Sequence, residues 1–159
     1  MRKGAVIMLY KTINLKKLLL SAAFPVGVGI LAAFVGGRAQ YSGLAKPPLA
    51  VPGWLFLVAG ILFYCLIGAA AYFVSYRADP AAMRCYYVQL AVGFLWQILF
   101  FRFLMFKTAL FVVTVLLALV FLNTTLFFKS EKTAGVLFAP YLLWTAYLFY
   151  LNIGIAVLR

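Results

Sequence analysis

Residues 108–128 of the chain read TALFVVTVLLALVFLNTTLFF, an unbroken run without a charged side chain. An α-helix of this length rises about 30 Å, which matches the hydrocarbon core of a bilayer. The strands of a membrane β-barrel would instead alternate apolar and polar residues over about 10 positions. The run therefore predicts a transmembrane α-helix.

Four further uncharged stretches occur along the chain, and short basic segments separate them. They are residues 18–37, 47–76, 85–101 and 133–158. The stretch 85–101 is the shortest, but the long side chain of Arg102 can reach the interface from its end. We expect helices at about residues 18–37, 53–76, 81–104, 108–128 and 134–157. The predicted fold class is all-α, a polytopic membrane protein with a five-transmembrane-helix bundle. It forms one domain over residues 1–159, which starts with a basic segment at 1–17.

The composition supports a membrane protein and argues against a soluble one. Apolar residues make up 68% of the 159 residues, charged residues make up 10%, and the mean hydropathy is +1.12. The 14 Lys and Arg and two Asp and Glu are too few to cover the surface of a soluble domain. The apolar majority must face lipid or other helices.

The distribution of the basic residues predicts an orientation. Nine of the 14 fall on the side of the N-terminus and five on the other side, so the positive-inside rule predicts a cytoplasmic N-terminus. A signal peptide is disfavoured because the first apolar run exceeds the usual length of about 7 to 15 residues. The net charge of +12 indicates contact with anionic lipid headgroups and no nucleic-acid partner, since no basic soluble surface is predicted.

The side chains that most enzymes use are missing from the predicted spans. The chain has no histidine, and its only carboxylates, Asp79 and Glu131, lie in connections between spans. We therefore expect no catalytic residue, no metal site, no resident cofactor and no buried carboxylate relay for protons. Cys65 and Cys85 are expected to be packing residues.

Aromatic and polar side chains share one face on two of the predicted helices. The faces are Gln89, Gly93, Trp96 and Phe100 on the third helix, and Pro140, Trp144, Tyr147 and Leu151 on the fifth, with Tyr141 and Asn152 at the flanks. Such a face can form a pocket wall or simply pack against another helix. Buried amides are costly in hydrocarbon, so Gln89 and Asn152 are expected to point into the bundle.

Small residues recur at every fourth position of the first predicted helix, at Gly29, Ala33 and Gly37. This spacing lets helices approach closely. It fits packing within the bundle and a dimer interface equally well.

Five short motifs occur in order along the chain. They are Tyr41, Leu44, Lys46 and Pro47; then Pro52 and Trp54; then Tyr64 and Gly68; then Gln89, Leu90, Trp96, Phe100 and Phe101; and finally Pro140, Tyr141, Trp144, Leu151 and Asn152. In order and spacing these motifs resemble the translocator protein family, also called the tryptophan-rich sensory protein family. The resemblance covers about residues 20–158.

The resemblance implies a pocket in a five-helix bundle, beneath the loop between the first two helices, that binds porphyrins and other flat apolar ligands. The leading hypothesis is a membrane receptor or sensor for tetrapyrroles of porphyrin or heme type. The alternatives are slow light-dependent porphyrin breakdown and transport of porphyrins or small hydrophobic molecules. We also expect a homodimer in a bacterial cell membrane.

The predicted ligand-binding residues combine the motifs with the two aromatic faces. They are Tyr41, Lys46, Pro47, Trp54, Tyr64, Gln89, Trp96, Phe100, Pro140, Tyr141, Trp144, Ala146, Tyr147 and Asn152. Lys46 or Arg38 at the rim is expected to meet a carboxylate of the ligand.

The chain departs from the family pattern at several positions. Gln40, Leu49 and Gly60 stand where the family has Trp, and Val51 replaces a Pro. Gly93 replaces the Asn of the third helix, which removes a polar group from the predicted pocket.

Overall fold

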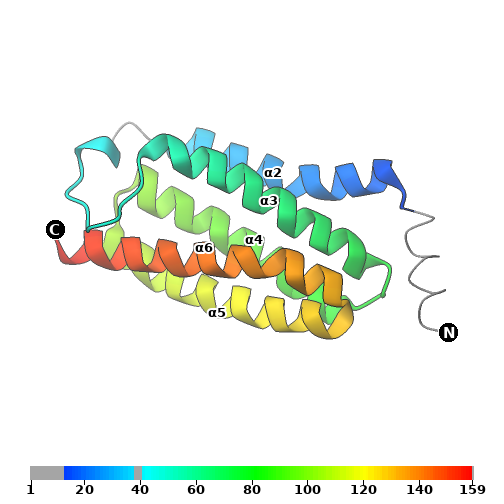
Figure 1. The fold of residues 1–159 in the computed structure, drawn as a ribbon. Coiled ribbons are helices and arrows are strands. Elements are labelled where there is room, and N and C mark those ends of the chain that lie inside the picture. The colour runs from blue at the N-terminus through cyan, green and yellow to red at the C-terminus, as the bar shows by residue number, and fades with distance from the viewer. Residues whose placement is uncertain (1–12, 38–40, 159) are drawn as a thin grey trace.

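A computed structural model of the protein describes residues 13–37 and 41–158, and this part of the chain is helical, with five long helices (Figure 1). The helices are α2 (Leu15–Gly36), α3 (Gly53–Ser75), α4 (Pro80–Gln97), α5 (Phe106–Ser130) and α6 (Lys132–Val157). Counting α4 together with the turn that extends it, each is long and apolar enough to cross a membrane. The predicted fold class is confirmed.

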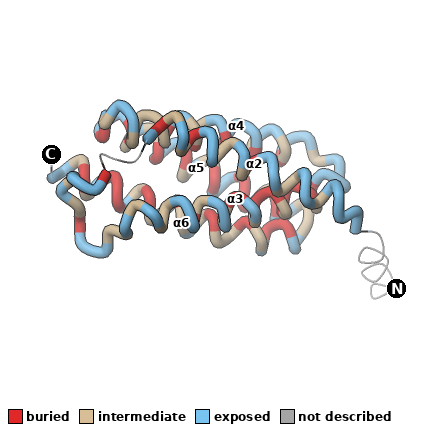
Figure 2. Tube along the Cα trace, turned by 90° about the horizontal axis from the view of Figure 1, so that it is seen from above, coloured by how far each residue is buried: buried red, intermediate tan, exposed pale blue. Residues whose placement is uncertain are grey.

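Successive helices run in opposite directions, so the beginning of α2 and the end of α6 lie at opposite ends of the bundle (Figure 1). The neighbours in space include α2 with α3, α3 with α6, α6 with α5, and α5 with α4. The buried residues turn toward these neighbours, while exposed residues cover the outside (Figure 2). This outside is rich in Leu, Ile, Val and Phe, as lipid contact requires.

Side-chain caps fix the starts of two helices. The Asn14 side chain accepts a hydrogen bond from the Lys17 backbone N–H at 3.1 Å and caps α2. Asp79 accepts bonds from two backbone N–H groups in the first turn of α4, and Pro80 occupies the first helical position. These are preferred residues for these positions because the first N–H groups of a helix have no partner within it.

The third span ends differently from the sequence prediction. Its α-helical part ends at Gln97, and a π-helical turn, Ile98–Arg102, completes the span instead of a regular helix to about residue 104. Arg102 donates from its guanidinium to the Val35 carbonyl in the last turn of α2, at 3.1 Å. The carbonyls at a helix C-terminus carry partial negative charge, so this cation stabilises the end of α2. π-Helical turns frequently occur at functional sites.

The backbones of α2 and α3 approach each other closely at Gly68. A Cβ atom there would lie 2.5 Å from the Ala22 Cα, and the Ser21 hydroxyl donates to the Gly68 carbonyl at 2.7 Å. Only glycine permits this contact. At the same end of the bundle Arg77 pairs with Glu131, which links the α3–α4 connection to the start of α6.

Candidate ligand-binding site

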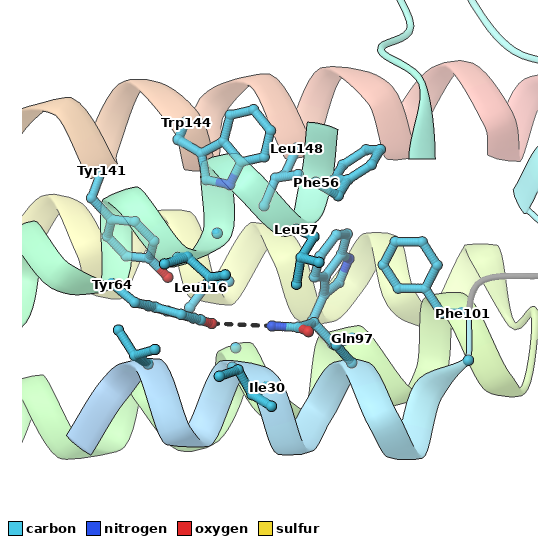
Figure 3. A pocket seen from close by; sticks show the side chains of 18 residues that line it. Ile30, Phe56, Leu57, Tyr64, Gln97, Phe101, Leu116, Tyr141, Trp144 and Leu148 are labelled. Carbon is cyan, nitrogen blue, oxygen red and sulfur yellow. Dashed lines mark hydrogen bonds between the residues drawn. The ribbon is translucent and has the colours of Figure 1, made fainter. Parts of the chain in front are cut away.

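A cavity lies inside the bundle, and all five helices contribute to its wall (Figure 3). Its inner volume is about 60 Å³, and the space reaches about 740 Å³ when the open mouth is included. The wall consists of Val26, Gly29, Ile30, Ala33, Gly37, Phe56, Leu57, Gly60, Ile61, Tyr64, Gly93, Trp96, Gln97, Phe101, Leu116, Tyr141, Trp144 and Leu148. None of these side chains is charged.

Several wall residues of α2 and α3 are exposed at the surface, among them three large apolar side chains. Ile30 is 50% exposed, Leu57 39% and Ile61 38%. The rim on these two helices is therefore apolar. Such a rim suits a ligand that dissolves in lipid.

Trp144 is the centre of the aromatic wall. Its ring stacks on Phe63 and on Tyr147 at a centroid distance of 5.3 Å in both cases, and Phe56 meets it edge-on at 5.8 Å. Phe101 in turn meets Phe56 edge-on at 5.8 Å. Because each ring is held by other rings, the rings of the wall have fixed orientations, and an aromatic wall of this kind suits a flat aromatic ligand.

Polar atoms gather at one place in this apolar wall. The Gln97 side-chain nitrogen donates to the Tyr64 hydroxyl at 3.1 Å, and the Tyr141 hydroxyl turns toward Tyr64 (Figure 3). Two glycines make room for this group. A Cβ on Gly29 would lie 2.2 Å from the Tyr64 ring, and a Cβ on Gly93 would lie 3.8 Å from the Tyr64 hydroxyl.

Asn152 holds Trp96 in place from behind the cavity. The Trp96 indole N–H donates to the Asn152 side-chain oxygen, and the Asn152 amide donates to the Phe106 carbonyl, both at 2.9 Å. Asn152 is fully buried, and both ends of its amide are bonded. The link fixes the rotation of the indole and connects α4, α5 and α6.

The segment between α2 and α3 is fastened to the end of α6. The Tyr147 hydroxyl accepts from the Val51 N–H at 3.0 Å and donates to the Leu49 carbonyl at 3.1 Å. The Tyr150 hydroxyl donates to the Pro48 carbonyl at 2.7 Å, and the Pro47 ring fills the space where a Cβ on Gly154 would be. Two tyrosines and one glycine therefore hold this segment over one end of the bundle.

Tyr41 is the buried anchor at the start of this segment. Its hydroxyl donates to the Val51 carbonyl at 2.9 Å, and the Lys46 ammonium lies 5.0 Å from the centre of its ring. Burial, with a smaller contribution from nearby Tyr147, raises the pKa of Tyr41 to about 12. Lys46 also donates to the Ser42 carbonyl at 3.0 Å.

The amino-acid sequence matches the model of one protein family over residues 21–158, described as the TspO/MBR family. This chain belongs to the TspO/MBR family. The match begins within α2 and extends over the other four spans, so the family assignment applies to the bundle.

Several curated proteins are similar to this TspO/MBR chain. The tryptophan-rich protein TspO of Archaeoglobus fulgidus is 30% identical over 152 residues, which are 92% of this chain and 99% of that protein. The tryptophan-rich sensory protein of Cereibacter sphaeroides is 38% identical over 65% of this chain and 66% of its own length. A translocator protein homolog of Schizosaccharomyces pombe is 31% identical over 77% of this chain and 79% of its own.

The structure brings four of the predicted ligand-binding residues of this TspO/MBR chain to the cavity wall. They are Tyr64, Trp96, Tyr141 and Trp144. Tyr147 and Phe63 support Trp144 from outside the wall, and Asn152 supports Trp96. The predicted cation Arg38 lies outside the described residues.

The other predicted residues lie away from the wall. Trp54 is 66% exposed on the outer surface of α3, and Ala146 is exposed on α6. Tyr41, Lys46 and Pro47 belong to the fastened segment, Phe100 is buried in the ring cluster beside Trp96, and Pro140 is half-buried within α6.

Gln89 lies on the same helix as the cavity residues but not in the wall. It is fully buried, and neither atom of its amide has a hydrogen-bond partner among the described residues. The same is true of the Asn123 amide on α5 and of the Tyr86 hydroxyl. The prediction that Gln89 points into the bundle agrees with its burial, but the cavity amide is Gln97.

Sequence reasoning missed Phe56, Gln97 and the α2 residues of the wall. Phe56 lines the wall, whereas Trp54 is exposed on the outer surface of α3. Eight and ten residues before Tyr64 both lie about 80° around the helix from it, on opposite sides, so the register with Tyr64 could not distinguish the two. The spacing of Gly29, Ala33 and Gly37 did indicate a close approach, and all three line the cavity.

Proposed function

We propose that this TspO/MBR protein is a membrane receptor or sensor that binds tetrapyrroles and related flat apolar molecules in the cavity. The proposal rests on the aromatic wall centred on Trp144. The name of the Cereibacter sphaeroides relative, a tryptophan-rich sensory protein, agrees with a sensing role.

The chemistry of the wall selects the class of ligand. Apolar and aromatic side chains dominate it, and polar groups occur at one place, which is typical of small-molecule pockets. A charged group placed inside would lose its hydration without a counter-ion. The carboxylates of a porphyrin would therefore remain at the mouth while the macrocycle lies on the rings.

The cavity in this structure is smaller than such a ligand. Its inner volume is about 60 Å³, whereas ligand pockets in general have volumes of about 300–1,000 Å³. Binding therefore requires the apolar rim on α2 and α3 to part. Only three residues of α2, namely Pro25, Ala32 and Gly36, are fully buried, fewer than in any other long helix, so α2 is the part of the rim that we expect to move.

Titration of the detergent-purified protein with protoporphyrin IX tests the proposal. We expect quenching of tryptophan fluorescence and a shift of the porphyrin absorption band. The change Trp144→Leu should weaken binding about tenfold, because it removes the central ring of the aromatic wall and loosens the rings packed on it. Affinities of the variants are compared by porphyrin absorption, which does not depend on the number of tryptophans.

Trp54→Leu is the matched control, because Trp54 is exposed and outside the wall. It should leave the affinity unchanged. Equal affinity of the Trp144→Leu variant and the unmodified protein would contradict the proposed site.

A further inference from the structure

Gln97 supplies the one side-chain amide in the cavity wall. Its nitrogen carries two N–H groups, and Tyr64 accepts one of them at 3.1 Å. The other has no acceptor among residues 13–37 and 41–158. An amide with a spare donor in an apolar cavity is suited to bind an acceptor on a ligand.

Gly93 provides the space that the Gln97 amide uses. Helical side chains lean toward the N-terminus, so the side chain of Gln97 covers the level of Gly93, one turn earlier. A Cβ on Gly93 would lie 3.8 Å from the same Tyr64 hydroxyl that accepts the Gln97 bond. Gly93 therefore leaves a gap in the wall, and the Gln97 amide, one turn later, reaches the same Tyr64 hydroxyl.

The rings on either side of Gln97 decide which part of a ligand can reach its amide. It is the last residue of α4 before the π-helical turn, and its neighbours Trp96 and Phe101 are rings of the wall. A ligand lying on these rings would bring its edge to the amide. The ligand atom at that edge decides whether the spare N–H is bonded or left without a partner.

We infer that Gln97 determines ligand specificity, selecting flat, uncharged ring systems that carry a carbonyl or similar hydrogen-bond acceptor at one edge. This inference rests on the proposed function of the cavity. It adds the chemical group that the cavity recognises. An aromatic ligand without an acceptor would cover the amide and leave its N–H unpaired, which lowers affinity.

The probes for the test are 9-fluorenone and fluorene, two flat tricyclic molecules that differ at one carbon, a carbonyl in the first and a methylene in the second. Affinities are measured with the purified protein in one detergent by quenching of tryptophan fluorescence. Each probe also partitions into the detergent, but to the same extent with every variant. This effect therefore cancels when the fluorenone-to-fluorene affinity ratio is compared between variants. We expect Gln97→Met, which keeps length and removes the donor, to lower the fluorenone-to-fluorene ratio about fivefold.

Two further variants separate the amide from its surroundings. Gln89→Met removes the buried amide on the same helix that does not line the cavity, and it should leave the ratio unchanged. Tyr64→Phe removes the hydroxyl that accepts from Gln97, and it should retain the preference for fluorenone. Gln97→Met should bind fluorene at least as tightly as the unmodified protein does, because the unpaired N–H is gone, and this retained binding shows that the cavity is intact.

An unchanged fluorenone-to-fluorene ratio in Gln97→Met would overturn the inference. A preference for fluorenone that is lost in Tyr64→Phe but kept in Gln97→Met would also overturn it. If the unmodified protein binds protoporphyrin IX but shows no preference for fluorenone, the inference fails and the proposed function stands. Failure to bind both probes and protoporphyrin IX would overturn both.

Discussion

The ring of Tyr64 lies directly over Gly29, in the space where any other residue at position 29 would place its Cβ, 2.2 Å from the ring. This contact joins α2 and α3 beside the cavity. It also sets the position of the hydroxyl that Gln97 contacts. The smallest residue on one helix therefore determines where the polar group of the cavity lies.

Replacing Gly29 by Ala should displace Tyr64 and change the cavity. The Cβ would require the ring or α2 to move, and overpacking of this kind costs about 1–3 kcal/mol. We expect a lower midpoint of thermal unfolding and weaker protoporphyrin IX binding. Gly27→Ala is the matched control, because a Cβ there meets no atom within 4 Å. Equal behaviour of the two variants would show that Tyr64 adapts without cost.

Replacing Asn152 by Leu should destabilise the bundle and loosen Trp96. The indole N–H would lose its acceptor inside the protein, at a cost of about 1–3 kcal/mol. Adding Trp96→Phe removes the donor as well, so the double variant should lose less stability than the two single changes predict together. Chemical unfolding of the four proteins measures this coupling. Additive effects would mean that the bond contributes little.

Ionisation of Tyr41 should release the segment between α2 and α3 at high pH. The pKa of Tyr41 is about 12 in the folded protein, against an ordinary value of 10.0. The folded protein thus favours the protonated form of Tyr41. The stability that protonated Tyr41 contributes is fully present below pH 10 and is lost as the pH rises through 12. The ionised Tyr41 oxygen then has no proton to donate to the Val51 carbonyl.

The difference in tyrosinate absorbance between the unmodified protein and Tyr41→Phe, followed against pH, isolates this group. We expect its midpoint near 12. A midpoint near 10 would contradict the buried, hydrogen-bonded position of Tyr41.

The sequence was sufficient for the fold because the bilayer imposes it. Runs such as 108–128 have no other stable arrangement in lipid than a helix. The end of the third span escaped prediction because a π-helical turn has no simple pattern of apolar residues.

The site was predictable only in part. Trp96 and Trp144 could be found because large rings on an inner helical face mark a wall. The choice between Gln89 and Gln97 could not be made from spacing. Both lie on the inner side of α4, and which of them meets the cavity depends on how α2 and α3 approach, at contacts such as that of Gly29 with Tyr64.

Replacing Gln89 by Leu should stabilise the protein, unlike most changes of a buried residue. Its amide is fully buried without a hydrogen-bond partner among the described residues, so it contributes a desolvation cost and no bond. Leucine has a similar volume and removes the unpaired atoms, which should raise the free energy of unfolding by about 1 kcal/mol. Gln97→Leu, which breaks the bond to Tyr64, should lower it. Thermal unfolding in one detergent compares the two. A loss of stability in both variants would show that the Gln89 amide binds a partner such as buried water, and that α4 carries two polar sites in place of one.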